Sequence, residues 1–224
     1  GYWSPATGAQ FVGEPVLSAW GAYGYQTGAM GYPRSGGVAG VGGSRHQIFE
    51  GGIAYWRPGG RVSFIHGSIL NAWAASGWER SWLGLPTSHE TASTKGGVFQ
   101  RFERGVGYWS PATGAQFVGE PVLSAWGAYG YQTGAMGYPR SGGVAGVGGS
   151  RHQIFEGGIA YWRPGGRVSF IHGSILNAWA ASGWERSKVG LPTGSAVRQA
   201  DGTMTQTFER GSISVAPNGK VAIR

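Results

Sequence analysis

The chain repeats itself every 53 residues, and this period constrains the fold more than any other feature of the sequence. Four tetrapeptides coincide at that spacing without a gap: YWSP at 2, YWRP at 55, YWSP at 108 and YWRP at 161. The related SVAP at 214 falls in the same frame. Residues 1–81 are also identical to residues 107–187. A repeat of this length is one supersecondary unit that stacks on its neighbours to bury its apolar face. The sequence therefore predicts a single repeat domain over residues 1–224.

Each unit is expected to contain a β-hairpin, a short helix and a third strand. In residues 52–65 two short alternating runs flank Pro-Gly-Gly, which predicts a hairpin with a glycine turn. Residues 66–77 predict a helix that Gly77 ends in the left-handed region. A Gly-x-Pro corner and a strand of pattern QxFE follow. This period gives units at 1–53, 54–106, 107–159 and 160–212, with a terminal hairpin at 213–224.

The predicted fold class is α+β, with the units curving into a propeller-like, closed or nearly closed ring. The first hairpin has no QxFE strand before it, because the chain has five hairpin starts but four such strands. We therefore expect the chain to come from a longer protein in which earlier residues, such as a catalytic domain, precede Gly1.

Composition narrows the function classes. The chain has 224 residues with 45 Gly and 11 Trp, and 12% of its residues are charged, which argues against disorder. It has no Cys, which excludes disulfides and thiolate metal sites. No run of eighteen apolar residues could span a bilayer. The formal net charge of +8 indicates a basic soluble surface or attraction to an anionic polymer.

Residues that recur at one position of every unit are expected in the core. The helix stripe gives two such sets: Trp20, Trp73, Trp126 and Trp179, and Leu17, Leu70, Leu123 and Leu176. The hairpin strands give two more: Trp3, Trp56, Trp109 and Trp162, and Phe11, Phe64, Phe117, Phe170 and Ile223. We predict that all four sets are buried, because stacked units need the same core residue at each step.

The candidate binding residues are tyrosines and glutamates that recur together, five positions apart. Each tyrosine points to the face opposite its neighbouring tryptophan, where the terminal hairpin has Ser214, so we expect a half-exposed surface. Such a tyrosine either packs against the next unit or stacks on a sugar ring. Each glutamate either holds a turn through backbone hydrogen bonds or binds a sugar hydroxyl or a cation. The candidate carbohydrate-binding pairs are Glu50 with Tyr55, Glu103 with Tyr108, and Glu156 with Tyr161.

Catalytic machinery is expected to break the repeat pattern, and the sequence shows no such break. Asp201, the single aspartate, lies in QADGT and predicts a turn, while His89 stands alone in a polar loop. The other histidines have no metal-ligand spacing, so no metal or cofactor is expected. GGVAGVGGS at 36–44 lacks a GK[ST] sequence and predicts a flexible connection. The arginines are scattered at turns and strand ends, which argues against nucleic-acid binding.

The 53-residue spacing, the LGxP corner, the FERG or FEGG strand and the YWxP hairpin together resemble LGFP repeats over essentially the whole chain. The third letter of the corner is Tyr or Leu here in place of Phe. The resemblance assigns a structural role to the corner residues Gly31, Pro33, Gly84, Pro86, Gly137, Pro139, Gly190 and Pro192. It implies no catalytic residue.

LGFP repeats occur in exported proteins of actinobacteria with mycolate-type envelopes, often beside mycoloyltransferases, amidases or esterases. The resemblance therefore implies an extracellular, non-catalytic module that attaches an enzyme to cell-wall polysaccharide, either arabinogalactan or peptidoglycan. Two other classes stay open: a designed or recently duplicated structural scaffold without a ligand, and a fragment of a cell-wall hydrolase.

Overall fold

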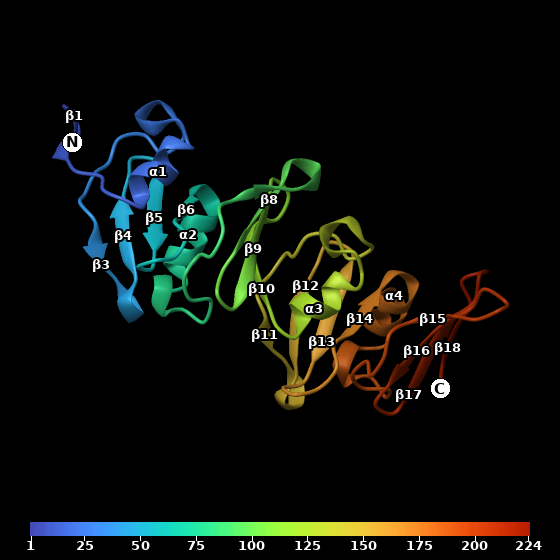
Figure 1. Cartoon of the computed structure of the whole chain (residues 1–224). Coiled ribbons are helices and arrows are strands. Elements are labelled where there is room, and N and C mark those ends of the chain that lie inside the picture. Colours follow the sequence, from blue (N-terminus) through green and yellow to red (C-terminus); the bar gives the residue numbers. More distant parts are fainter. The chain divides into compact units, whose positions relative to one another are not determined.

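The computed structural model describes all residues from Gly1 to Arg224 as an α+β chain of repeated antiparallel sheets (Figure 1). Four sheets have four strands each, and the sheet at the N-terminus has two. The chain divides into two compact units, unit 1 from Gly1 to Gly119 and unit 2 from Glu120 to Arg224. No helix is both long and apolar enough to cross a membrane.

Unit 1 contains the two-stranded sheet and two of the four-stranded sheets. The two-stranded sheet is the hairpin of β1 (Tyr2–Ser4) and β2 (Gly8–Gln10). The first four-stranded sheet has β3 (Val38–Ala39), β4 (Arg45–Ile48), β5 (Gly52–Trp56) and β6 (Ser63–His66). The second has β7 (Thr91–Ala92), β8 (Val98–Arg101), β9 (Gly105–Ser110) and β10 (Gly114–Gly119).

Unit 2 contains the other two four-stranded sheets. One has β11 (Val144–Ala145), β12 (Arg151–Ile154), β13 (Gly158–Trp162) and β14 (Ser169–His172). The other has β15 (Val197–Arg198), β16 (Met204–Phe208), β17 (Gly211–Val215) and β18 (Val221–Ile223). Neighbouring strands in all of these sheets follow one another in the chain, so the predicted QxFE strand and hairpin lie in one sheet.

One short α-helix follows each of the first four hairpins, as the sequence predicts. The helices are α1 (Val16–Gly21), α2 (Gly67–Ala75), α3 (Val122–Gly127) and α4 (Gly173–Ala181). A 3₁₀-helix follows each of them: η1 (Tyr25–Thr27), η3 (Trp78–Arg80), η5 (Tyr131–Thr133) and η7 (Trp184–Arg186). Gly77 adopts φ 103° between α2 and η3, which confirms the predicted left-handed end of that helix.

Segment 36–44 differs from the predicted flexible connection. It contains β3 and the 3₁₀-helix η2 (Val41–Gly43), and the Ser44 hydroxyl donates to the Val41 carbonyl over 2.7 Å. The loops at the same place in the second and third repeats contain η4 (Thr94–Gly96) and η6 (Val147–Gly149). A polar side chain therefore closes a turn that the glycine content alone suggested was loose.

The helix tryptophans form the centre of the core, as predicted. Trp20, Trp73, Trp126 and Trp179 are all fully buried. In unit 1 two clusters surround Trp20 and Trp73, and in unit 2 a cluster surrounds Trp179. The leucines of the helix stripe are half-buried at the cluster edges. The Trp73 indole N–H donates to the Gly84 carbonyl over 3.1 Å, which ties the helix to the Gly-x-Pro corner.

Two predicted core residues lie on the surface. Trp3 is 65% exposed and Phe11 is 76% exposed, although Phe64 and Phe170 at the same strand position are buried. Both exposed residues belong to the two-stranded sheet and the segment that leaves it. The hairpin has no further strand on which these side chains could pack, which is the physical reason for the error.

The Gly-x-Pro corner is clamped to the end of the QxFE strand. Glu103 Oε2 accepts the Leu85 backbone N–H over 3.2 Å, and the Glu103 N–H donates to the Leu85 carbonyl over 3.0 Å. Gly84 has φ 72°, and a Cβ there would lie 2.2 Å from Glu103 Oε2. Only glycine therefore both adopts this left-handed backbone conformation readily and leaves room for the Glu103 carboxylate. The same carboxylate-to-corner bond occurs at Glu50, Glu156 and Glu209.

Candidate functional site

The structure does not bring the predicted glutamate and tyrosine pairs together. Tyr55 lies opposite His46 in the β4–β5 register, whereas Glu50 lies in the turn that joins those two strands. Tyr108 likewise lies opposite Phe99, while Glu103 lies in the turn between β8 and β9. A spacing of five residues along a tight hairpin thus separates the two side chains instead of joining them.

The expected half-exposed tyrosine surface is wrong. Tyr55, Tyr108 and Tyr161 are buried, with exposed fractions of 4%, 6% and 7%. Tyr55 contacts Trp73 edge to face at a ring distance of 5.1 Å and stacks on His46 at 5.4 Å. Burial, the charge of Glu79 and a hydrogen bond to that carboxylate raise the pKa of Tyr55 above its ordinary value. For Tyr161, burial and the charge of Glu185 raise the pKa to about 12.

Glu103 lines a hollow together with Tyr55, and not with its expected partner Tyr108. We name this the corner hollow. Its walls in unit 1 include Tyr55, Arg57, Arg61, Pro86, Thr87 and Glu103, and its volume is about 170 Å³. A copy of about 270 Å³ in unit 2 includes Tyr161, Arg163, Arg167, Pro192, Thr193 and Glu209. In these two hollows Glu103 and Glu209 therefore each lie with a tyrosine 48 residues earlier in the chain.

An ion pair between Arg57 and Glu103 crosses the corner hollow. Arg57 Nη2 lies 2.6 Å from Glu103 Oε1, and its Nη1 donates to the Gly42 carbonyl. Partial burial favours the neutral carboxyl, but Arg57, the Leu85 N–H and Arg104 together hold the pKa of Glu103 below its ordinary value. In unit 2 the hydrogen bond from Arg163 is the main cause of the lowered pKa of Glu209. Both carboxylates are therefore ionised and engaged at neutral pH.

A second and larger hollow lies beside Tyr55. We name this the aromatic hollow; it has a volume of about 470 Å³ and is lined by His46, Ile48, Ile53, Tyr55, Gly77, Trp78, Glu79 and Arg80. Trp78 is 40% exposed and contacts Trp73 edge to face at a ring distance of 5.6 Å. The hollow thus combines an exposed indole with a carboxylate, an imidazole and a guanidinium.

Trp78 occupies a strained backbone position, because its φ is 58° and non-glycine residues seldom adopt the left-handed region. Holding a bulky residue there costs on the order of 1–2 kcal/mol. Unit 2 repeats the arrangement: Trp184 has φ 57° and is 41% exposed, and His152 stacks on Tyr161 at 5.4 Å. A strained, exposed aromatic ring at the same place in both units favours a role in binding.

Sequence reasoning missed Trp78 and Trp184, although a signal for them is present. A glycine, an aromatic residue and Gln or Glu recur every 53 residues, as GYQ at 24 and 130 and GWE at 77 and 183. All four aromatic residues have positive φ and are at least 40% exposed. In the first of the GYQ repeats, however, a Cβ on Gly21 would lie 2.8 Å from the Tyr25 hydroxyl. The Tyr25 side chain therefore lies against the preceding helix α1.

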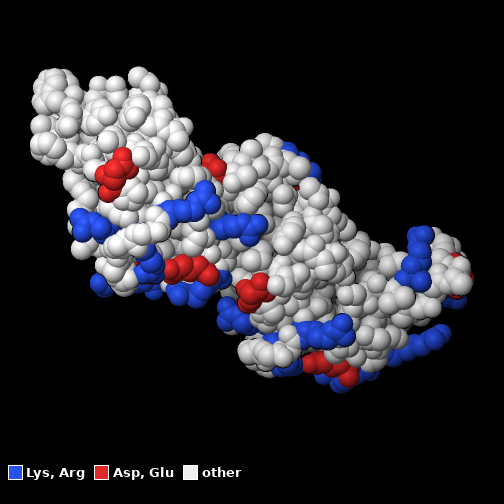
Figure 2. All heavy atoms as spheres, in the orientation of Figure 1, with Lys and Arg blue, Asp and Glu red and all other residues white.

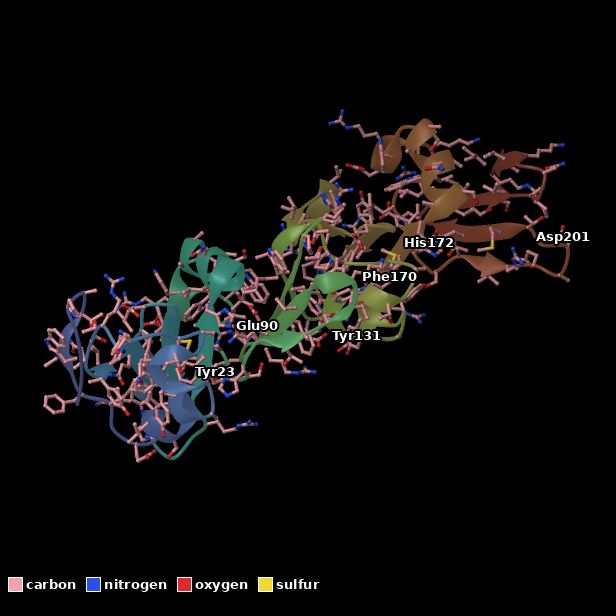
Figure 3. The ribbon with its side chains drawn as sticks, turned by 90° about the horizontal axis from the view of Figure 1, so that it is seen from above. Tyr23, Glu90, Tyr131, Phe170, His172 and Asp201 are labelled. Carbon is pink, nitrogen blue, oxygen red and sulfur yellow. The ribbon has the colours of Figure 1, made fainter.

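One cluster in unit 1 does break the repeat, contrary to the sequence-based expectation. His89 is not isolated: its Nδ1 accepts the Phe64 N–H over 3.2 Å, and its ring packs at 5.1 Å from Tyr23. Glu90 is the next residue, and its Oε1 lies 3.8 Å from the His66 Nε2. Burial raises the pKa of Glu90 despite the charge of His66. Figure 3 labels Tyr23 and Glu90 of this cluster. The aligned residues in unit 2 are Ser195 and Ala196.

The remaining sequence candidates have local roles or form no site. Asp201 lies in the turn between β15 and β16, and its carboxylate accepts the Thr203 N–H over 2.9 Å, which confirms the predicted turn (Figure 3). No three His, Asp or Glu side chains lie close enough together to hold a metal ion.

Comparison with protein families identifies the repeat. The family described as LGFP repeat matches residues 1–28, 30–81, 83–134 and 136–187, which is most of the chain. No curated protein sequence matches the chain.

Among solved structures, selenomethionine-substituted virginiamycin B lyase from Staphylococcus aureus matches with 10% identity and a TM-score of 0.18. A streptogramin B lyase matches with 12% identity and a TM-score of 0.17. In both cases 84% of this chain aligns with 53% of the lyase, so the chain spans about half the length of these proteins. TM-scores this low carry no argument about the fold or the function of this chain.

Proposed function

Because the chain belongs to the LGFP repeat family, we propose that it is a non-catalytic module that holds an exported protein to cell-wall polysaccharide. LGFP repeats occur in cell-surface proteins and are generally not catalytic. The proposed ligand is arabinogalactan or peptidoglycan, and the proposed location is outside the cell. A catalytic domain joined covalently in the full-length protein is the proposed cargo.

The aromatic hollow carries this proposal. Carbohydrate sites use an aromatic face for the apolar side of a sugar ring and place polar groups around it for the hydroxyls. Trp78 offers the exposed indole, while Glu79, His46 and Arg80 line the same hollow. Glu79 is held by the Tyr55 hydroxyl, so its carboxylate is oriented before a ligand arrives.

The proposed ligand contacts differ from the pairs expected at first. Tyr55 and Tyr161 stay in the site as buried supports for the carboxylates Glu79 and Glu185. In this proposal Trp78 and Trp184 take the stacking role expected of the tyrosines, and Glu79 and Glu185 take the hydroxyl-binding role expected of the glutamates. Glu50, Glu103 and Glu156 each bind a corner N–H, and Tyr108 is buried, so their contribution is to position the fold.

Two sites on one chain suit a polymeric ligand. The aromatic residues Trp78 and Trp184 lie one in each unit, 106 positions apart in the sequence. Linked sites that engage one polymer together bind it about 100-fold or more tightly than either site alone, where the geometry allows both contacts. Loss of one site should therefore weaken binding moderately, and loss of both should nearly abolish it.

The test is binding of the isolated chain to purified cell-wall polysaccharide, measured by sedimentation. We expect Trp78→Asn with Trp184→Asn to lower affinity by about 100-fold, because both stacking surfaces are removed. Asn tolerates the left-handed region, so the backbone conformation is kept. Trp3→Ala is the matched control, because Trp3 is more exposed than Trp78 but lies outside the hollow. Full retention of binding by the folded double variant would refute the proposal.

The identity of residues 1–81 and 107–187 favours a second candidate, a duplicated structural scaffold without a ligand. A scaffold requires only that the units pack on one another. The closed or nearly closed ring also stays a prediction, and small-angle X-ray scattering of the chain would test it. Failure of every wall fraction to bind, together with one cooperative melting transition at high temperature, would favour the scaffold.

A further inference from the structure

The corner hollow contains a second arginine that the fold does not use. Arg57 is engaged by Glu103 and by the Gly42 carbonyl. Arg61, on the same turn, is exposed, lines the hollow and forms no ion pair. Arg167 has the same position in unit 2. Since Arg57 already neutralises the carboxylate in the hollow, the charge of Arg61 stays uncompensated.

The pKa of a neighbouring histidine reflects the uncompensated charge of Arg61. Burial is the larger cause of the lowered pKa of His89, and the charge of Arg61 is the second cause. Arg61 therefore imposes a positive potential on its surroundings. Figure 2 shows that most of the visible surface carries no charge, and that Lys and Arg side chains lie in a few groups, some beside acidic residues.

The turn that supplies Arg61 is not required by the hairpin. The first and third hairpins turn through PATGA at 5–9 and 111–115, whereas the second and fourth turn through RPGGR at 57–61 and 163–167. Both sequences join paired antiparallel strands, as the registers of β1–β2 and β5–β6 show. The first arginine of RPGGR supports the fold through its bonds, but the second has no such role. An exposed arginine without a structural contact, in the wall of a hollow, favours a ligand.

We infer that each corner hollow binds an anionic group, a carboxylate or a phosphate, carried by a polymer. Arg61 presents the planar fork of donors that suits such a group. Thr87, which is exposed in the same wall, offers a hydroxyl, and Pro86 gives an apolar surface. A hollow of about 170 Å³ admits a single substituent and not a folded partner.

This inference rests on the proposed function and deepens it, because it specifies that the polysaccharide carries acidic substituents. The two kinds of site are separable. The aromatic hollow takes a neutral ring on Trp78, and the corner hollow takes an anion on Arg61. Removing one arginine from each unit should therefore reduce binding to acidic polymers and leave binding to neutral polymers unchanged.

The experiment compares two double variants of equal charge at about 0.15 M salt, where unspecific attraction is largely screened. The test variant is Arg61→Gln with Arg167→Gln. The control is Arg34→Gln with Arg140→Gln, because these exposed arginines follow corner prolines outside the corner hollows and form no ion pair. The probes are polygalacturonate for carboxylate, polyphosphate for phosphate, dextran as the neutral polymer and phosphatidylglycerol vesicles.

We expect the test variant to lose about tenfold in affinity for at least one polyanion and the control less than about twofold. Equal losses in both variants would show attraction by net charge alone and overturn the inference. Absence of loss in the test variant would overturn it too, as would binding to the vesicles without binding to either polyanion.

The same samples separate this inference from the proposed function. Each variant is also assayed for sedimentation with purified wall polysaccharide, alongside Trp78→Asn with Trp184→Asn. If the arginine pair governs polyanion binding while the wild-type chain ignores the wall, the anion site stands and the wall ligand fails. If wall binding depends on the tryptophans but not on the arginines, and polyanion binding does not change, the anion site fails alone.

Discussion

Two hairpins with the same sequence have different environments in unit 1. The residues of β1 and β2 are repeated letter for letter in the β9–β10 hairpin. In β9–β10 each strand has six residues, and β8 pairs along the outer edge of β9. In β1–β2 each strand has three residues, and the sheet has no further strand. The difference therefore comes from the neighbours of the hairpin and not from its own residues.

Burial follows the same division. Trp3 and Phe11 are exposed, whereas their counterparts Trp109 and Phe117 are half-buried and pack on the cluster around Trp73. The helix α2 contacts both β9 and β10, and it supplies the apolar surface that the first hairpin lacks. A hairpin of this sequence is thus one wall of a core whose other walls belong to the preceding repeat (Figure 1).

Removing the support of the β9–β10 hairpin should have the largest effect. We expect Trp73→Ala to lower the free energy of unfolding by about 3–5 kcal/mol, because a fully buried indole leaves a cavity and the Gly84 carbonyl loses its donor. Trp3→Ala should change it by less than about 0.5 kcal/mol, because an exposed side chain loses little contact. Urea denaturation of both variants is the measurement. Equal stability of the two variants would mean that Trp73 does not hold the core.

Equivalent substitutions in the two hairpins test the comparison itself. Phe117→Ala should destabilise unit 1 by about 2–3 kcal/mol, since Phe117 contacts Phe102 edge to face at 5.7 Å and is half-buried. Phe11→Ala replaces the identical residue of the first repeat, which is 76% exposed, and should cost less than about 0.5 kcal/mol. Thermal melting compares the two directly. A comparable loss at Phe11 would show that the first hairpin is packed in solution.

The two α-helices of unit 1, α1 and α2, differ by one hydrogen bond. The Trp73 indole N–H donates to Gly84, whereas the Trp20 indole N–H is buried without a hydrogen-bond partner. Trp73→Phe should therefore cost about 1–2 kcal/mol more than Trp20→Phe, because only the first change removes a bond and leaves a carbonyl unsatisfied. The same denaturation series gives the difference. Equal costs would show that the Trp20 N–H finds a partner in solution.

The parts of the fold that the sequence predicts are those that recur. Trp73 and its counterparts appear in one register four times, and a stacked repeat must bury such a residue. The class of each element follows from local signals, such as the glycine turn at 57–61 and Gly77 after α2. The clamp between Gly84 and Glu103 joins positions 19 apart, and the repeated pattern indicates each residue but not their contact.

The site was predicted less well, for two physical reasons. Alternation along β5 shows which side Tyr55 faces but not whether that side is covered, and in this strand every residue is buried. The positive φ of Trp78 is imposed by the surrounding structure against the preference of the residue, so propensity rules cannot find it. The repeated glycine–aromatic pair at 77–78 was the available signal.

The smallest expected effect is a pH dependence that only the loop before β7 and β8 confers. Burial and the charge of Arg61 lower the pKa of His89 from its ordinary value of 6.5. The unprotonated His89 Nδ1 accepts the Phe64 N–H. A group with a lowered pKa in the folded state binds more protons when unfolded. Its contribution is therefore complete above pH 6.5 and is lost as the pH falls toward the folded value.

Glu90 opposes this trend only at lower pH. Its pKa is raised from 4.5, so the folded state binds an extra proton there and gains stability as the pH falls. We expect the free energy of unfolding to drop between about pH 7.5 and about pH 5.5 by no more than about 1 kcal/mol, because His89 is half-buried and partly screened. His89→Asn keeps an acceptor that does not titrate, and His46, His66, His152 and His172 are unchanged. The drop should shrink in this variant, and an unchanged slope in urea titrations at the two pH values would assign it to the other histidines.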